Sequence, residues 1–211
     1  QVLDTFRPQI YPKPMSDDIR EALADYIGAK PENFIVGNGG DEMITYLLGT
    51  FLDPGDQILI HSPTFDMYEL GAETLGASSI KVQDLPGYRR DQKGLLEAVR
   101  KYQPKVTVIC NPNNPTGYLY SEEELQRLRD IVLSHDLYLF ADEVYREFRY
   151  TDAPYLSALC LEGLEQNVVV IDSVSKRYSE CGTRIGMIVS HNKEAMAAIL
   201  KFCQARLSPP L

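Results

Sequence analysis

The chain has 211 residues, of which 44% are hydrophobic and 24% charged, and its formal net charge at pH 7 is −9. This length allows one large domain with a sizeable core. Because no basic stretch offsets the negative charge, the composition argues against nucleic acid or an anionic membrane as a partner.

Several other classes of protein are also disfavoured. No apolar run approaches the ~20 residues that span a bilayer, and the first residues do not have the pattern of a signal peptide. The four cysteines, Cys110, Cys160, Cys181 and Cys203, form no C-x-x-C pair, and the three histidines lack metal-ligand spacing. We therefore expect a cytoplasmic protein without a metal site.

In chain order, the first predicted segments are an arm and a helix. Pro8, Pro12 and Pro14 predict an extended N-terminal arm over residues 1–15. A helix is predicted to follow at about residues 16–27.

From residue 34 onward, strand-like runs alternate with amphipathic helical patterns. Seven strands are predicted, over residues 34–36, 57–61, 79–82, 105–110, 137–141, 168–172 and 184–190. Helices are predicted over residues 41–52, 66–75, 92–102 and 121–135. This alternation predicts an α/β fold, a three-layer α/β/α sandwich around a mostly parallel sheet.

The interval between the sixth and seventh predicted strands breaks this rhythm. It is too short for an ordinary crossover helix and its two loops. We therefore expect the seventh strand to run antiparallel to the sixth. The final residues, QARLSPPL, follow a helical segment directly and contain two prolines. We expect the chain to be a fragment or an engineered version of a longer protein.

Ligands of a parallel sheet bind beyond the carboxyl ends of its strands, so the residues that follow each strand are informative. The first strand is followed by GNGGDE, residues 37–42. Glycines before a helix leave backbone amides free to bind an anion such as a phosphate. A tight turn with Asp41 as the helix cap is the alternative. A dinucleotide fingerprint is excluded, because Glu42 stands where a third glycine is required.

The second and fourth strands are followed by aromatic and amide groups. SPTFDMY places Phe65 and Tyr68 at the crevice, where an aromatic ring could stack on a planar ligand or simply pack in the core. NPNNPTG, residues 111–117, has three asparagines and two prolines, more than a turn requires. Its prolines predict a stiff, extended turn from which side-chain amides project.

The fifth and sixth strands are followed by charged and hydroxyl groups. Asp142 and Glu143 end the apolar run LYLFA, where a carboxylate must find a partner or stay hydrated. Tyr145 lies three residues after Asp142. Two hydroxyls and two cations come next: Ser173, Ser175, Lys176 and Arg184.

These groups would all be used by one ligand, a flat, phosphorylated heteroaromatic aldehyde with a basic ring nitrogen, which is pyridoxal 5′-phosphate (PLP). The motifs NPNNPTG, DEVY and SVSKRYSECGTRIG closely resemble those of fold-type I PLP-dependent aminotransferases of classes I and II. Residues up to about 117 are more similar to histidinol-phosphate aminotransferases, and the rest to the aspartate aminotransferase group. Both a recombined or designed chain and a natural divergent member would have this mixed character.

The resemblance implies a role for each matching residue. Lys176 would form a Schiff base with PLP and later transfer a proton, and Asp142 would pair with the pyridine nitrogen. Tyr145 and Asn114 would hydrogen-bond the phenolic oxygen of the ring, against which Phe65 would stack.

The resemblance also implies how the phosphate is held and how subunits share the site. The phosphate would be bound by backbone amides, hydroxyls and a guanidinium, from Gly40, Asp41, Ser173, Ser175 and Arg184. Tyr11 would reach the phosphate of a neighbouring subunit, which implies a homodimer. Glu143 is expected to be a structural ion-pair partner.

By the same resemblance, residues 16–211 would be the PLP-binding large domain, and the C-terminal small domain would be absent. The arginine that binds the substrate carboxylate in the family has no match in this sequence. The expected reaction is amino-group transfer from an amino acid to a 2-oxo acid. Two alternatives remain open: another PLP reaction, such as a lyase, racemase or decarboxylase, and a truncated PLP-binding core with weak or no transaminase activity.

Overall fold

The computed structural model describes residue 13 and residues 15–204. The predicted arm over residues 1–15 lies almost wholly outside this part of the chain. The described residues contain a seven-stranded sheet: β1 (Phe34–Gly37), β2 (Gln57–Ser62), β3 (Ser78–Gln83), β4 (Val106–Cys110), β5 (Tyr138–Asp142), β6 (Val168–Ser173) and β7 (Gly186–Val189).

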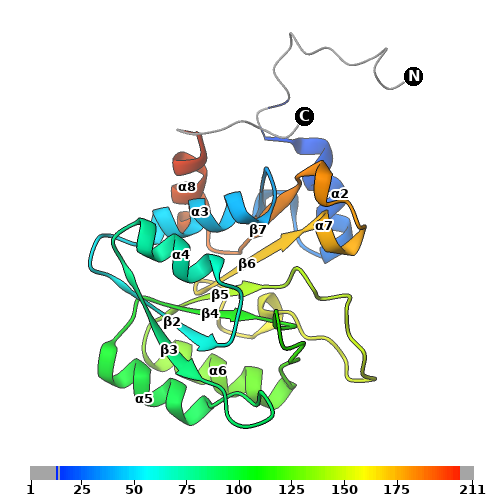
Figure 1. The fold of residues 1–211 in the computed structure, drawn as a ribbon. Coiled ribbons are helices and arrows are strands. Elements are labelled where there is room, and N and C mark those ends of the chain that lie inside the picture. Colours follow the sequence, from blue (N-terminus) through cyan, green and yellow to red (C-terminus); the bar gives the residue numbers. More distant parts are fainter. Residues whose placement is uncertain (1–12, 14, 205–211) are drawn as a thin grey trace.

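The strands lie in the order β1-β7-β6-β5-β4-β2-β3 (Figure 1). Strands β2 to β6 pair in parallel, whereas β7 is antiparallel to both of its neighbours, β1 and β6. The prediction of a mostly parallel sheet with an antiparallel last strand is confirmed.

Helices cover both faces of the sheet (Figure 1). They are α2 (Asp17–Ile27), α3 (Gly40–Phe51), α4 (Met67–Thr74), α5 (Gln92–Tyr102), α6 (Glu122–Ser134), α7 (Val174–Arg177) and α8 (Lys193–Gln204). Single 3-10 turns occur at Pro31–Asn33, Ala158–Cys160 and Cys181–Thr183.

The core is divided between the two faces because neighbouring residues of a strand point to opposite sides of the sheet. On one face, α2, α5 and α6 pack against side chains such as Leu139 and Val170. On the other, α3, α4 and α8 pack against Phe140 and Ile171. The predicted three-layer α/β/α architecture is thereby confirmed.

The observed boundaries of the predicted elements lie within one residue of the predicted ones, except at the start of the seventh strand. The seventh strand was expected from residue 184 but begins at Gly186. Arg184 has a φ of 56°, in the left-handed region, and therefore cannot continue a strand. The short helix α7 was not predicted, because four residues carry too little periodicity.

The start of α3 approaches the sheet very closely, and a glycine in β7 makes this possible. A Cβ atom at Gly186 would overlap the carbonyl of Gly39 and lie 2.6 Å from the Gly40 nitrogen. The glycine loop before α3 consequently rests directly on the end of β7. Among the described residues, no helix combines the length and apolar character needed to cross a membrane.

Candidate active site

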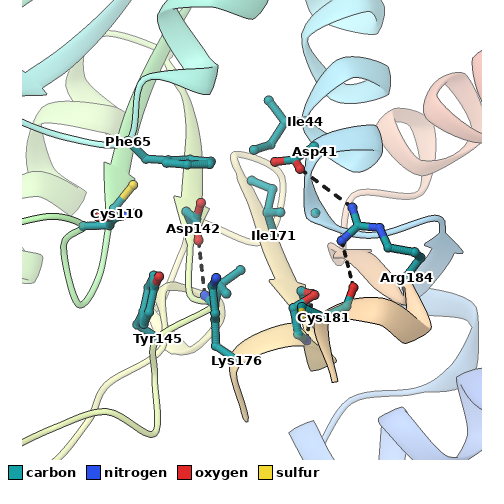
Figure 2. Close-up of a pocket in the computed structure, with 15 residues that line it drawn as sticks. Asp41, Ile44, Phe65, Cys110, Asp142, Tyr145, Ile171, Lys176, Cys181 and Arg184 are labelled. Carbon is teal, nitrogen blue, oxygen red and sulfur yellow. Dashed lines mark hydrogen bonds and ion pairs between the residues drawn. The ribbon is translucent and has the colours of Figure 1, made fainter. Parts of the chain in front are cut away.

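A cavity of about 180 Å³ opens beyond the carboxyl ends of β4, β5 and β6, beside the start of α3 (Figure 2). Ten residues that the sequence analysis assigned to a cofactor line it: Gly40, Asp41, Phe65, Asn114, Asp142, Tyr145, Ser173, Ser175, Lys176 and Arg184. Tyr11, the eleventh, lies outside the described residues. The lining also includes Ile44, Cys110, Val144, Ile171 and Cys181.

Asp142 is the last residue of β5 and is buried, with 7% of its surface exposed. Its Oδ2 accepts a hydrogen bond from the Tyr68 hydroxyl at 2.9 Å, and its Oδ1 accepts one from the Val144 amide at 3.2 Å. Burial raises the pKa of the carboxyl to about 6, and the nearby carboxylate of Asp172 adds to the effect. A cation in the cavity would therefore be favoured beside it.

Lys176 lies in α7, on the opposite side of the cavity from Phe65 (Figure 2). Its Nζ is 5.9 Å from the centroid of the Tyr145 ring. The Lys176 side chain is solvent-accessible, whereas Tyr145 and Phe65 are half-buried. An amine and a phenol thus stand together at the cavity, facing an aromatic ring.

The three asparagines of NPNNPTG have different environments. Asn111 and Asn113 are buried; the Oδ1 of Asn111 accepts a hydrogen bond from the Tyr120 amide at 3.1 Å. Asn113 donates to the Pro63 carbonyl at 3.1 Å and accepts from the Thr64 hydroxyl at 2.9 Å, which ties this loop to the segment that carries Phe65. Asn114 is half-buried and lines the cavity.

At the far end of the cavity, helix α3 presents its N-terminus. The helix cap is Gly39, with a φ of 91°, and Asp41 lies inside the first turn. The alternative in which Asp41 caps the helix is therefore wrong. The Nη2 of Arg184 is 3.7 Å from the Asp41 carboxylate, and its Nη1 donates to the Cys181 carbonyl at 3.2 Å. These two contacts hold a guanidinium beside free helical amides.

Two hydroxyls flank this end. Ser173 ends β6 and caps α7, and its Oγ accepts a hydrogen bond from the Ser175 amide at 3.1 Å. The Ser173 hydroxyl lies 3.1 Å from the Ile185 carbonyl and 2.8 Å from the Ser175 hydroxyl. Together with Arg184 and the start of α3, these hydroxyls make an anion-binding corner.

Glu143 faces away from the cavity, consistent with the expected structural role. Its Oε1 accepts hydrogen bonds from the Ser157 hydroxyl at 2.9 Å and the Ala158 amide at 2.8 Å. Its Oε2 is 3.7 Å from Arg146. Burial raises the pKa of the Glu143 carboxyl to about 7, and Arg146 opposes that effect.

Two side-chain contacts near the cavity were not predicted from the sequence. Tyr68 was noted only as an aromatic, although a buried tyrosine hydroxyl needs a hydrogen-bond partner and so signals a nearby acceptor. The ion pair between Asp172 and Arg177, 2.6 Å long, was not anticipated. The sequence feature that could have indicated this ion pair is an aspartate inside β6, a strand whose six residues are all buried, because a buried carboxylate needs a partner. In the described part of the chain, no cluster of three or more histidine, cysteine, aspartate or glutamate side chains could hold a metal ion.

Residues 6–209 match the protein family aminotransferase class I and II. The chain belongs to this family. It is 34% identical over 213 residues to a histidinol-phosphate aminotransferase of Caldanaerobacter subterraneus subsp. tengcongensis, covering 99% of this chain and 56% of that protein.

Solved structures of the family share the fold. An aspartate aminotransferase from Thermus thermophilus with maleate has a TM-score of 0.86 at 29% identity, covering 95% of this chain and 54% of that one. N-succinyldiaminopimelate aminotransferase from Mycobacterium tuberculosis has a TM-score of 0.87 at 26% identity, covering 93% and 53%. The chain thus spans about half the length of these aminotransferases, and the predicted resemblance is confirmed.

Proposed function

We propose that the cavity binds PLP and that the chain is the cofactor-binding part of an aminotransferase. The observation that carries the proposal is that an amine, a buried carboxylate and an anion-binding corner line one cavity. These are Lys176, Asp142 and the group around Arg184. Within this proposal, residues 16–211 form the PLP-binding domain.

Asp142 and Phe65 would hold the ring of PLP, the first by pairing with its nitrogen and the second by stacking. The carboxylate of Asp142 is oriented by Tyr68 and by the Val144 amide, and its burial makes a cationic partner favourable. A protonated pyridine nitrogen would be that partner, and Asp142 would in turn keep the nitrogen protonated. Phe65 offers the stacking surface.

The phosphate of PLP would be held by the residues at the opposite end of the cavity. The backbone amides of Gly40 and Asp41 lie at the start of α3, where the helix dipole favours an anion. Arg184 supplies the balancing charge, and Ser173 and Ser175 supply hydroxyls.

The remaining groups would act on the reactive side of the ring. When bound, the cofactor withdraws electrons from the α-carbon of an amino acid. Lys176 would hold PLP covalently through Nζ and later carry the proton that leaves the substrate. Tyr145 and Asn114 would donate hydrogen bonds to the phenolic oxygen and so fix the orientation of the ring.

The proposed substrates are an amino acid and a 2-oxo acid, and the names of the relatives as aminotransferases support amino-group transfer. Among the described residues that line the cavity, the cationic side chains are Lys176 and Arg184, and both are used for the cofactor. A substrate carboxylate therefore needs a cation from outside this set. We propose that the working form is a homodimer in which Tyr11 contacts the neighbour's phosphate.

A second candidate is favoured by the same need for another cation. In it, the 211-residue chain binds PLP but turns over slowly or not at all. Steady-state assays on a panel of amino acids, run beside a PLP titration, separate the two: binding without turnover supports this second candidate. Lyase or racemase products without amino-group transfer would favour a different PLP reaction.

We also propose a cytoplasmic setting. The four cysteines are free thiols, and burial raises the pKa of Cys110 and Cys203 to about 12, which keeps both unreactive. Free thiols are typical of a reducing compartment.

The decisive experiment is to add PLP, reduce with borohydride and map the modified residue by mass spectrometry. We expect Lys176 to carry the cofactor, and Lys176→Ala to abolish both the adduct and the visible absorbance of lysine-bound PLP. Lys93→Ala, on the exposed face of α5, is the control and should change neither. Modification of another lysine in the parent chain would contradict the site assignment.

A further inference from the structure

The short helix α7 carries two neighbouring cationic side chains, Lys176 and Arg177, which lie on opposite sides of it. Lys176 lines the cavity, whereas the next residue, Arg177, points to the opposite side, where 3% of its side chain is exposed. A buried guanidinium requires compensation by charge or hydrogen bonds. The contacts of Arg177 therefore show what holds the back of α7.

Arg177 joins three separate segments. Its Nη2 is 2.6 Å from Oδ2 of Asp172, the fully buried aspartate of β6. Its Nε is 3.0 Å from Oε1 of Glu147, in the loop after β5. The guanidinium carbon lies 4.5 Å from the centroid of the Tyr26 ring, in α2. The Tyr26 hydroxyl donates to the same Glu147 oxygen at 2.6 Å.

The ion pair between Arg177 and Glu147 connects the same two segments as the contact between Lys176 and Tyr145 at the cavity. Lys176 lies next to Arg177 in the chain, and Tyr145 lies two residues before Glu147. The same two segments are thus joined twice: by Arg177 and Glu147 at the back, and by Lys176 and Tyr145 at the cavity, 5.9 Å apart.

A helix of four residues is not stable by itself, because a single turn costs more free energy to form than its hydrogen bonds return. Its place in the structure therefore depends on contacts with other segments. Helix α7 is anchored at its start by the Ser173 cap and by a hydrogen bond from the Val174 amide to the Ile185 carbonyl at 3.2 Å. Both anchors lie at the start of α7, whereas the backbone hydrogen bonds at its end, such as that from the Tyr178 amide to the Val174 carbonyl at 3.1 Å, stay within the helix itself. Arg177 is the buried side chain at that end.

We propose that Arg177 is a positioning residue for Lys176: by binding Asp172 and Glu147 behind α7, it sets where the Lys176 amine stands relative to Tyr145. The role of Lys176 rests on the proposed function. Asp172 and Glu147 are the two carboxylates through which Arg177 acts. Glu147 has a second, more distant cationic partner in Arg146, whose Nε is 3.7 Å from the same Oε1.

Measurements with two ligands can distinguish a role of Arg177 in positioning Lys176 from a general role in stabilising the cavity. PLP has an aldehyde and can be trapped on Lys176 by borohydride, whereas pyridoxamine 5′-phosphate has the same ring and phosphate but cannot join the lysine. Loss of positioning slows trapping of the first ligand and leaves the affinity for the second unchanged. General damage to the cavity would both slow the trapping of PLP and lower the affinity for pyridoxamine 5′-phosphate.

Three variants of the 211-residue chain test the proposal. Glu147→Gln removes one charge at a partly exposed site and should not endanger folding. Arg177→Lys keeps the charge but loses the fork that reaches two carboxylates. Asp172→Asn combined with Arg177→Met removes both buried charges together, which avoids leaving either one unpaired. Arg129→Met, an ion-paired arginine of α6 remote from the cavity, is the control.

We expect each test variant to slow trapping on Lys176 by about ten-fold or more, because displacements near 1 Å have effects of this size or larger. Affinity for pyridoxamine 5′-phosphate should equal that of the parent, and the control should match the parent in both measurements. Unchanged trapping in Glu147→Gln and Arg177→Lys would overturn the proposal. An equal decrease in PLP trapping and in pyridoxamine 5′-phosphate affinity would also overturn it. If the parent chain traps no PLP on Lys176, the proposed function itself fails, which is a different outcome.

Discussion

The hydroxyl of Tyr68 donates a 2.9 Å hydrogen bond to Oδ2 of Asp142, and both residues are buried. Tyr68 comes from helix α4 and Asp142 from strand β5, so the bond connects a surface layer to the centre of the sheet. It helps to keep the carboxyl ionised, since it lowers a pKa that burial raises.

Tyr68→Phe removes this bond without changing the shape of the side chain. We expect PLP affinity near pH 7 to fall by about ten-fold, which corresponds to ~1.4 kcal/mol for one hydrogen bond to a charged group. Absorbance titration with PLP measures the effect. Tyr118→Phe is the matched control, because its hydroxyl donates to Glu124, away from the cavity lining. Equal affinities in Tyr68→Phe and the parent would exclude a role for the bond.

The raised pKa of Asp142 predicts how the stability of the PLP-free chain depends on pH. The folded state holds this proton more tightly than the unfolded state, because burial raises the pKa of the carboxyl from its ordinary 3.8 to about 6. Its stabilising contribution is therefore present below about pH 4 and is lost as pH rises through about 6. Glu143, whose pKa is raised to about 7, acts in the same direction.

Asp142→Asn removes the charge that burial disfavours. We expect the variant to exceed the parent in free energy of unfolding by about 2–3 kcal/mol at pH 7.5, and the difference to shrink toward pH 4. Urea unfolding of both chains without PLP, at several pH values, measures this. PLP binding should weaken in the same variant, because the partner of the ring nitrogen is lost. A variant less stable than the parent at pH 7.5 would contradict the prediction.

Arg184 is expected to recognise the phosphate group specifically. Arg184→Gln should lower PLP affinity by about 10- to 100-fold, the range for one charge-assisted contact of 1.5–3 kcal/mol. Affinity for pyridoxal, which lacks the phosphate, should change little. The control is Arg89→Gln, an exposed arginine outside the cavity lining. An equal loss for PLP and pyridoxal would point instead to a general structural role.

Gly186 permits the close approach of the glycine loop to β7. In Gly186→Ala, the new Cβ would overlap the Gly39 carbonyl and displace the start of α3. We expect a loss of about 1–3 kcal/mol in free energy of unfolding, together with weaker phosphate binding. Gly182→Ala is the control, since nothing lies within 4 Å of a Cβ there. Thermal unfolding of the two variants should therefore differ clearly.

The sequence by itself determined the architecture and the composition of the cavity. Strand and helix patterns are local and recur every few residues, so their alternation predicted the parallel sheet, and the short interval before β7 predicted its reversal. Because parallel strands bring their carboxyl ends to one edge, the positions of Asp142 and Lys176 after successive strands were enough to predict that they share a cavity. The role proposed for Tyr11 stays a prediction outside the described residues.

Only the tertiary structure decided which side chains support that cavity. The bond between Tyr68 and Asp142 joins residues 74 positions apart, and the contact of Arg177 with Tyr26 crosses from one end of the chain to the other. The structure also showed that Asn114 lines the cavity, whereas Asn111 and Asn113 are buried and hold the loop in place. No local pattern encodes such pairs, because they depend on how helices lie against the sheet and on where burial leaves a polar group in need of a partner.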